Sequence, residues 1–299
     1  MRVALRPPFA IRDDEALALE RVAPLAKMYV LSPFVWREGD SRRILVRAVP
    51  KRRDPRRKIS SIYYGEGVGG LHFRMDEEPV LAAGEGDDAG GCEDPTVVAH
   101  DGRYVVFYSG WSEERCESTL LAAVGASARR LEKTGRVPLE GGFANCKEAS
   151  VFPCDDGTPV LFFEYASGEH SLIGMARSAS LDGPWRPERS PLTTRYGYWD
   201  SWHLSTGPIV ATSRGPVMFY NGADEAGTWR VGWVAFDPAF TRCTARCGDP
   251  LFVAPPPKAG MRDVAFAASA VEADGAIHLY YTLSDAYLRR AIVLPEGAR

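Results

Sequence analysis

The segment Gly91-Cys-Glu-Asp-Pro-Thr-Val-Val98 contains an acidic pair directly before a proline, and apolar residues follow. Valine-rich sequence of this kind favours a β-strand. Because proline restricts the residue before it, we expect Asp94 to have extended backbone geometry where that strand begins. An Asp-Pro pair is also common in ordinary turns, so its meaning depends on the sequence around it.

The surrounding sequence repeats. A strand candidate with large residues near its end follows this segment at 105–109, and similar segments stand at 44–48, 160–164, 217–221 and 278–282. Their first residues are therefore 61, 55, 57 and 61 positions apart. A further strand candidate follows each copy, at 59–64, 120–124, 171–175, 229–233 and 288–293. A short segment precedes each copy, at 31–34, 94–97, 149–153, 207–210 and 263–266.

Repeats of about 58 residues with roughly four strands each match the blades of a β-propeller. Five such units account for the chain. We therefore expect an all-β protein, a single five-bladed β-propeller domain over residues 1–299. A β-sandwich is the alternative, but it does not require so even a period. The exception to the strand pattern is a short N-terminal helical segment, expected at about residues 13–27 from a weak apolar face that ends near Pro24.

Composition limits the class of partner. A formal net charge of -3 and a pI of about 6.0 argue against nucleic acid or an anionic membrane. The chain shows neither a signal-peptide pattern nor an apolar run of the roughly 20 residues that span a bilayer. Six cysteines without metal-ligand spacing are expected to be reduced thiols. These features predict a cytoplasmic protein with a small-molecule partner and no metal; a homo-oligomer is compatible with them.

A basic run lies between two strand candidates. Residues 42–58 contain nine lysines and arginines, interrupted by Pro50 and Pro55. We expect a solvated loop or a loop that contacts a neighbouring subunit. Alternatively, the run adds positive potential to the central channel, which would favour phosphate or an anionic sugar.

Polar residues recur where the predicted strands begin and end. In a propeller the innermost strands line a central channel, so these side chains are expected to converge there. The candidates are Arg47, Asp94, Lys147, Glu148, Glu164, Asp200, His203, Asn221, Arg262 and Asp285. Several carboxylates from separate blades suit glycosidic bond cleavage, which needs an acid for the departing oxygen and a second group for the nucleophile. Aromatic residues in the same loops are candidates for sugar stacking, although each alone is more often packing: Trp111, Trp199, Trp202 and Tyr287.

These motifs also occur in the order that one known family has. They are Val46-Arg47-Ala48, the segment that runs from Ile59-Ser60-Ser61 to His72-Phe73, Cys92-Glu93-Asp94-Pro95, Lys147-Glu148 through Phe152-Pro153, Trp199-Asp200-Ser201, and Tyr280-Tyr281 with Asp285. Over about residues 32–293 the sequence resembles glycoside hydrolase family 130, the β-mannoside phosphorylases and β-1,2-mannosidases. The resemblance implies a five-bladed fold, an inverting mechanism and no metal cofactor. It also implies that Asp94 is the general acid.

Three positions depart from the family's pattern. Thr96 follows Asp94-Pro95 where the family has arginine, and Asn221 replaces a histidine of the phosphorylases. Glu164 stands where the phosphorylases have an arginine that helps hold phosphate. Because a carboxylate repels phosphate, these changes favour water as the nucleophile.

The sequence therefore predicts an inverting glycoside hydrolase that acts on β-mannosides or manno-oligosaccharides. Asp94 protonates the departing oxygen, and Glu148, Glu164 or both activate water, with Glu225 as a third candidate base. An acid and a base of this kind are expected to face one pocket at a separation of about 6.5–9.5 Å. The expected substrate contacts are Arg47, Ser60, Lys147, Asp200, His203, Asn221, Arg262 and Asp285. The alternatives are a β-mannoside phosphorylase with inorganic phosphate as co-substrate and a non-catalytic carbohydrate-binding propeller.

Overall fold

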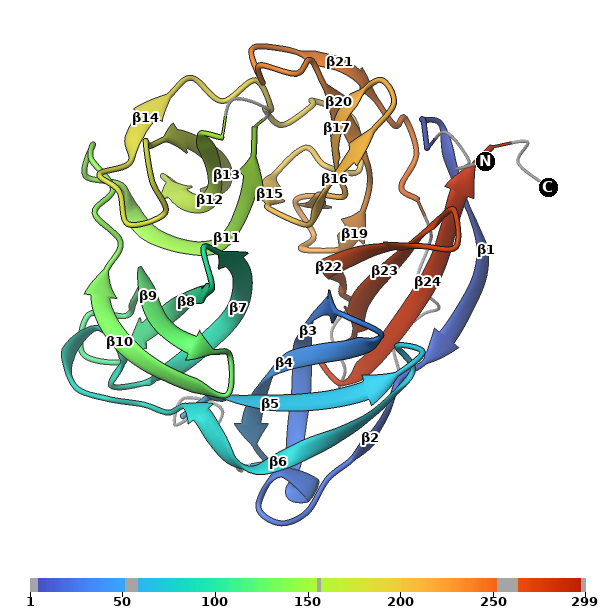
Figure 1. The fold of residues 1–299 in the computed structure, drawn as a ribbon. Coiled ribbons are helices and arrows are strands. Elements are labelled where there is room, and N and C mark those ends of the chain that lie inside the picture. The colour runs from blue at the N-terminus through green and yellow to red at the C-terminus, as the bar shows by residue number, and fades with distance from the viewer. Residues whose placement is uncertain (1–4, 52–58, 155–156, 252–262, 297–299) are drawn as a thin grey trace.

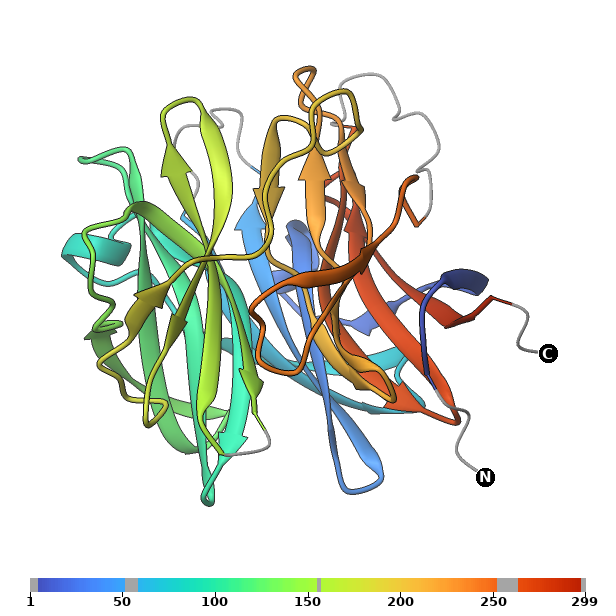
Figure 2. The ribbon, with the colours of Figure 1, turned by 90° about the horizontal axis from the view of Figure 1, so that it is seen from above.

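The computed structural model describes residues 5–51, 59–154, 157–251 and 263–296, which form an all-β structure. The strands are grouped into blades around a central axis (Figure 1). Figure 2, seen from another side, shows the strands of residues 91–188 (green to yellow) on one side of the molecule and those of residues 203–295 (orange to red) on the other. Apart from strands, the described residues contain two short 3-10 turns, Leu25–Lys27 and Gly86–Asp88. None of their helices is long and apolar enough to cross a membrane.

Four blades are continuous sheets. Blade I has the order β2-β6-β5-β4-β3, with β2 (Ala18–Glu20), β3 (Met28–Glu38), β4 (Ser41–Pro50), β5 (Ser61–Val68) and β6 (His72–Leu81). Blade II consists of β7 (Gly91–His100), β8 (Arg103–Ser112), β9 (Glu117–Ser127) and β10 (Arg130–Arg136). Blade III consists of β11 (Ala144–Pro153), β12 (Pro159–Ser167), β13 (His170–Arg177) and β14 (Arg186–Glu188). Blade V consists of β22 (Ala265–Ala273), β23 (Ala276–Leu283), β24 (Tyr287–Pro295) and β1 (Phe9–Ala16).

Blade IV is divided into two short sheets because three of its four strands are interrupted. One sheet contains β15 (His203–Ser205), β18 (Asn221–Ala223) and β19 (Trp229–Val231). The other contains β16 (Ile209–Thr212), β17 (Gly215–Met218), β20 (Val234–Phe236) and β21 (Cys243–Arg246). Since β15 continues into β16, β17 into β18 and β19 into β20, the two sheets are halves of one blade. The fold is thus the expected five-bladed propeller.

The predicted repeats correspond to equivalent strands. The segments at 44–48, 105–109, 160–164, 217–221 and 278–282 lie in the second strand of each blade. Their central side chains, such as Leu45, Phe107 and Phe162, are completely buried between neighbouring blades. This burial on both faces of the sheet explains why these segments are continuously apolar rather than alternating.

The expected helix at residues 13–27 is wrong. These residues form the end of β1, then β2, then one 3-10 turn. β1 pairs antiparallel with β24, and β2 pairs parallel with β6. Both are outer strands, which leave a sheet edge exposed unless another segment covers it. Pairing with these edges outweighs a weak helical pattern, and β1 joins the first residues of the chain to the last blade (Figure 1).

Side-chain hydrogen bonds join neighbouring blades close to the axis. Asn221 is completely buried and donates to the carbonyls of Thr206 (2.6 Å) and Ala267 (3.1 Å), while the Ala267 N–H donates to its Oδ1 (2.7 Å). Thr206 in turn donates from Oγ1 to the carbonyl of Glu148. These contacts connect blades III, IV and V.

The remaining junctions are made in the same way. The Ser269 hydroxyl donates to the Pro33 carbonyl (2.7 Å) and accepts from the Val35 N–H (2.8 Å), which connects blades V and I. Ser32 donates to Asp94 at 2.5 Å, and Thr96 donates to the Ala149 carbonyl at 2.6 Å. We call the six side chains of these bonds the axial belt. They are Ser32, Asp94, Thr96, Thr206, Asn221 and Ser269.

We expect Asn221→Ala to lower the free energy of unfolding by about 3 kcal/mol, because it leaves buried backbone groups of two blades without partners. Glu225→Ala, an exposed change in the same blade, is the control and is expected to alter the stability by less than about 0.5 kcal/mol. Urea unfolding followed by tryptophan fluorescence measures both. Equal stabilities of the two variants would contradict a structural role for Asn221.

Candidate active site

A cavity of about 200 Å³ lies on the axis, and every blade contributes to it. Its lining residues are Leu31, Ser32, Arg47, Asp94, Lys147, Glu148, Glu164, Trp229, Val264, Phe266, Thr282 and Asp285. The structure thus brings together six of the candidates named from the sequence: Arg47, Asp94, Lys147, Glu148, Glu164 and Asp285. Blades I to III contribute most of the charged side chains, whereas blades IV and V contribute the apolar Trp229, Val264 and Phe266 beside Thr282 and Asp285.

Bulges in the inner strands aim the polar side chains at the axis. The pairing register shifts between Leu31 and Phe34 in β3, between Glu93 and Thr96 in β7, and between Lys147 and Ser150 in β11. The bulged residues Ser32, Asp94 and Glu148 have φ angles of 51°, 47° and 51°. A regular strand points successive side chains to opposite faces, whereas a bulge breaks that alternation. Lys147 and Glu148 can therefore both line the cavity.

The expectation of extended geometry at Asp94 is wrong. Its φ of 47° lies in the left-handed region, and it sits inside β7 rather than at the strand's first residue. The preference that Pro95 imposes is overridden because Asp94 is the bulged residue, and aspartate tolerates this conformation better than most residues. Its side chain is then fixed by the hydrogen bond from Ser32 and by Arg47 Nη1, 3.3 Å from Oδ1 and 3.4 Å from Oδ2.

Glu93 and Ser60 do not line the cavity, but they hold Arg47 in place beside Asp94. Arg47 donates through Nη2 to Glu93, and the Ser60 hydroxyl donates to Glu93 at 3.1 Å. Ser60 is completely buried and is not among the lining residues, so it orients Glu93 and Arg47 rather than a substrate. Gly91, with φ 128°, bridges to Ser60, where a Cβ atom would lie 2.4 Å from the Ser60 nitrogen. Glycine is required at this contact.

Asp94 and Glu148 form a carboxyl pair that holds one proton. Burial alone would raise the pKa of Asp94, but the Arg47 charge and hydrogen bonds from Ser32 and Glu148 hold it below its ordinary value. Burial and the charges of Asp94 and Glu164 raise the pKa of Glu148 well above its ordinary value. Glu148 therefore carries the proton and donates a hydrogen bond to the Asp94 carboxylate. Two hydrogen-bonded carboxyls are closer than the separation expected of an inverting acid and base.

The cations that line the described part of the cavity are paired. Lys147 Nζ lies 3.2 Å from Glu164 Oε1, and the pKa of Lys147 is raised first by that charge. Arg47 is held between Glu93 and Asp94. Four carboxyl groups and two cations thus line the cavity: Asp94, Glu148, Glu164 and Asp285, with Arg47 and Lys147.

Other candidates from the sequence lie outside the cavity. Asp200 is completely buried, with ion pairs to Arg195 (2.8 Å) and Arg246 (2.5 Å) and a hydrogen bond from Tyr220. The side-chain amide of Asn221 already makes three hydrogen bonds, to the backbone of Thr206 and Ala267. Both side chains stabilise blade IV. Glu225 is exposed on a loop and does not line the cavity, and Arg262 lies outside the described residues.

His203 does not line the cavity itself but contacts Trp229, which does. Its ring stacks on Trp229 with 5.7 Å between centroids and 9° between planes. Its Nδ1 accepts a hydrogen bond from the Ser171 N–H at 3.0 Å, so in the neutral ring Nε2 carries the hydrogen. Burial lowers the pKa of His203, which favours that neutral form.

The sequence reasoning missed six lining residues: Leu31, Ser32, Trp229, Val264, Phe266 and Thr282. Ser32 had a usable signal, because Ser32-Pro33 stands in the first repeat where Asp94-Pro95 stands in the second. Of the expected stacking residues, Trp199 packs on Tyr220 with 5.5 Å between centroids and donates to the Gly248 carbonyl, away from the axis. Thr96, a departure from the family motif, bonds across to blade III.

No group of three or more His, Cys, Asp or Glu side chains in the described ranges is arranged to hold a metal ion. The six cysteines, all of which lie within those ranges, are free thiols.

The raised pKa of Glu148 predicts a pH-dependent stability. Between its ordinary value of 4.5 and the raised value, the folded protein binds a proton that the unfolded chain has lost. The contribution of Glu148 to stability therefore falls as pH rises, by at most about 1.4 kcal/mol per pH unit. Asp94 contributes in the opposite direction only below its ordinary value of 3.8, outside this window.

Glu148→Gln keeps the hydrogen bond to Asp94 without a titrating proton. We expect this variant to gain stability relative to the wild type as pH rises from 5 to 8, whereas the difference between the two should level off below pH 4.5, where Glu148 is protonated in both the folded and the unfolded chain. Urea unfolding at four pH values measures the difference. A difference that is constant over this range would contradict the assignment of the proton to Glu148.

Comparison with known proteins agrees with this architecture. The chain is 25% identical over 245 residues to a 1,2-β-oligomannan phosphorylase of Thermoanaerobacter sp. (strain X514), which covers 79% of each chain. It is similar in structure to a β-1,2-mannobiose phosphorylase from Listeria innocua (TM-score 0.75, 19% identity, 97% of this chain and 94% of the other). It is also similar to a glycosyl hydrolase from Bacteroides ovatus (TM-score 0.76, 21% identity, 95% of both chains). At these identities the structural likenesses show the fold.

The family itself is shown by sequence. The model of glycoside hydrolase family 130, described as β-1,4-mannooligosaccharide phosphorylase, matches residues 28–294. This match covers all five blades apart from β1 and β2 and includes every residue that lines the cavity. The chain belongs to glycoside hydrolase family 130, a family of enzymes that act on glycosides.

Proposed function

We propose that the protein is an inverting glycoside hydrolase that acts on β-mannosides or manno-oligosaccharides, and that its five blades act as one domain. The pairing of Arg47 and Lys147 with carboxylates supports water over phosphate as the nucleophile. A phosphate dianion would meet four carboxyl groups and no unpaired cation among the described lining residues. Water meets no such repulsion.

In this proposal Asp94 and Glu148 act together as the acid. The Glu148 proton moves along the shared hydrogen bond to Asp94, which passes it to the departing glycosidic oxygen. The charge of Arg47 stabilises the Asp94 carboxylate that remains after the proton has left. The close contact of the two carboxyls argues against Glu148 as the base opposite Asp94.

Glu164 is then the base. It is buried at the cavity wall, and Lys147 holds it from one side, so a water between Glu164 and the sugar can lose its proton to the free oxygen. As the glycosidic bond breaks, that water forms the new bond to the anomeric carbon from the opposite face. Arg47, Lys147 and Asp285 remain the substrate contacts, with His203 at the rim. Arg262 has no role in the proposal.

A second candidate is phosphorolysis, with inorganic phosphate as co-substrate. The name of the Thermoanaerobacter relative favours it. One experiment separates the two reactions. The enzyme is incubated with β-1,2- and β-1,4-linked manno-oligosaccharides with and without phosphate, and the products are resolved by anion-exchange chromatography. We expect free mannose at a rate that does not depend on phosphate. Mannose 1-phosphate that forms only when phosphate is present would establish the phosphorylase instead.

Asp94→Asn is expected to reduce kcat about 10²–10⁴-fold, because the amide cannot pass a proton to the departing oxygen. Asp101→Asn, a change on an exposed loop of the same blade, is the control and should retain wild-type activity. Steady-state kinetics on an unactivated mannoside, with thermal unfolding as a check on folding, give the comparison. Near wild-type turnover by Asp94→Asn would exclude Asp94 from the acid role.

A further inference from the structure

Five ring side chains follow one another from blade III to the cavity. The centroid distances are 4.2 Å for His170–Trp202, 6.4 Å for Trp202–His203, 5.7 Å for His203–Trp229 and 5.5 Å for Trp229–Phe266. All five rings are half-buried, so each keeps some surface open to solvent. We call these residues the aromatic row.

The aromatic row lies on the face where the cavity opens. His170, His203 and Trp229 are the first residues of β13, β15 and β19, and Phe266 is the second residue of β22. In every blade the first and third strands run in the same direction, so their first residues lie at the same end of the propeller. The lining residues Leu31, Lys147 and Val264 lie at or near the starts of inner strands at that same end. Strands β15, β19 and β22 are neighbours around the ring (Figure 1).

The row is held rigidly. The Trp202 carbonyl bonds to His170 Nδ1 at 2.9 Å, and His203 is fixed by the Ser171 N–H. The His203 ring lies nearly parallel to the Trp229 indole and stacks on it, while Phe266 also packs against that indole. Preorganised aromatic surfaces of this kind bind ligands with little loss of side-chain entropy.

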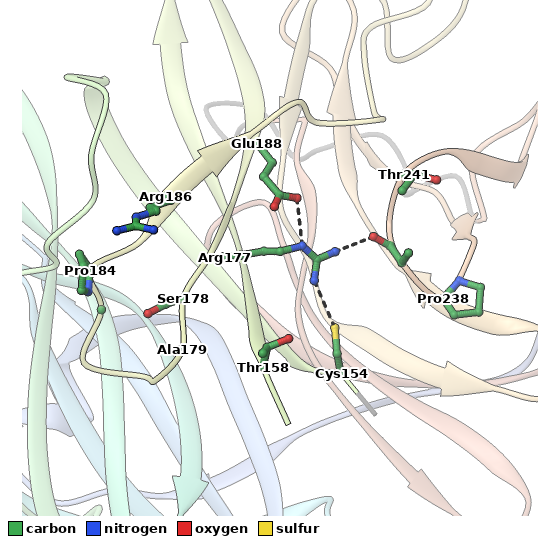
Figure 3. A pocket seen from close by; sticks show the side chains of 12 residues that line it. Cys154, Thr158, Arg177, Ser178, Ala179, Pro184, Arg186, Glu188, Pro238 and Thr241 are labelled. Carbon is green, nitrogen blue, oxygen red and sulfur yellow. Dashed lines mark hydrogen bonds and ion pairs between the residues drawn. The ribbon is translucent and has the colours of Figure 1, made fainter. Parts of the chain in front are cut away.

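A wide groove elsewhere on the described surface offers no comparable aromatic surface. It measures about 940 Å³ and lies between blades III and IV (Figure 3). None of its described lining residues is aromatic. Its Arg177 is already bound to Glu188 (2.9 Å), to the Ala239 carbonyl (2.5 Å) and to Cys154 Sγ (3.6 Å). The flat C–H face of a pyranose ring packs better on the aromatic row.

We propose that the aromatic row binds the sugars that follow the one in the cavity, with Trp229 next to the bond that is cleaved and Trp202 further along. The substrate is accordingly an oligosaccharide of at least three sugars, held by its end in the cavity. This inference rests on the proposed glycosidase function and adds the residues that set the preference for chain length. A cavity of about 200 Å³ has room for a single sugar, so further sugars must lie outside it.

The test compares kcat/KM on β-linked mannobiose, mannotriose and mannotetraose. For the wild type we expect a rise from mannobiose to mannotriose. Trp202→Ala should lower kcat/KM about tenfold on mannotriose, mostly through KM, and less on mannobiose. A tenfold loss corresponds to about 1.4 kcal/mol, which is the scale of one aromatic contact. Trp202→Phe keeps a ring and should recover most of the loss. Tyr196→Ala removes a fully exposed ring from the segment that precedes Trp202 in the chain and is the control.

The outcomes separate the two proposals. A Trp202→Ala loss that is equal at every chain length, or absent, would overturn the role of the row and leave the glycosidase function standing. An active wild type with no preference for mannotriose would do the same. A wild type that cleaves no mannoside of any length, with or without phosphate, would overturn both.

Discussion

The hydrogen bonds of the axial belt join the inner strands of all five blades, and the position of Asp94 depends on them. Ser32, Asp94 and Glu148 adopt left-handed backbone geometry, which costs on the order of 1–3 kcal/mol for each such residue. The belt offsets this cost, because Ser32 bonds to Asp94, Thr96 bonds across to blade III and Thr206 bonds to the Glu148 carbonyl. The same bonds that close the ring therefore aim the acid pair.

The charges of the site form a second network on this frame. Arg47 is shared by Glu93 and Asp94, and Lys147 is bound to Glu164. Arg47 and Lys147 are committed to these partners and cannot neutralise a further charge. Because two adjacent buried carboxylates repel each other, one proton remains on Glu148. The pair thus keeps a proton that Asp94 alone, with its lowered pKa, would lose. The apolar wall opposite, with Trp229 and Phe266, leaves the sugar ring a surface without charge.

The repeat was predictable from the sequence because second strands buried on both faces must be apolar, and their spacing is that of a blade. Arg47 and Glu164 could be found because each stands in the last half of such a second strand, and Asp94 because it stands in the short segment that precedes one. The pairing of β1 with β24 could not, since partners 273 to 286 positions apart leave no local pattern. Backbone geometry at Asp94 was also missed, because the bulge depends on pairing with β8.

Burial explains the other failures among the expected site residues. Asp200 and Asn221 are polar residues near strand ends, as Asp94 is, and no local feature tells a side chain that faces the axis from one that faces the next blade. Asp200 has Arg195 and Arg246 as partners, and Asn221 has the backbone of two blades. Trp229 was assigned to a strand because its neighbours Arg230 and Val231 continue one. Trp229 lies beside the axis because the blades are arranged in a circle, which a single strand does not reveal.

A crystal structure of the Glu148→Gln variant with a β-linked manno-oligosaccharide tests the central claim most directly. The account predicts the terminal sugar in the axial cavity, in contact with Asp94 and Arg47, and the following sugars against Trp229 and Trp202. Density for the sugar only in the groove between blades III and IV, with the axial cavity unchanged, would contradict it.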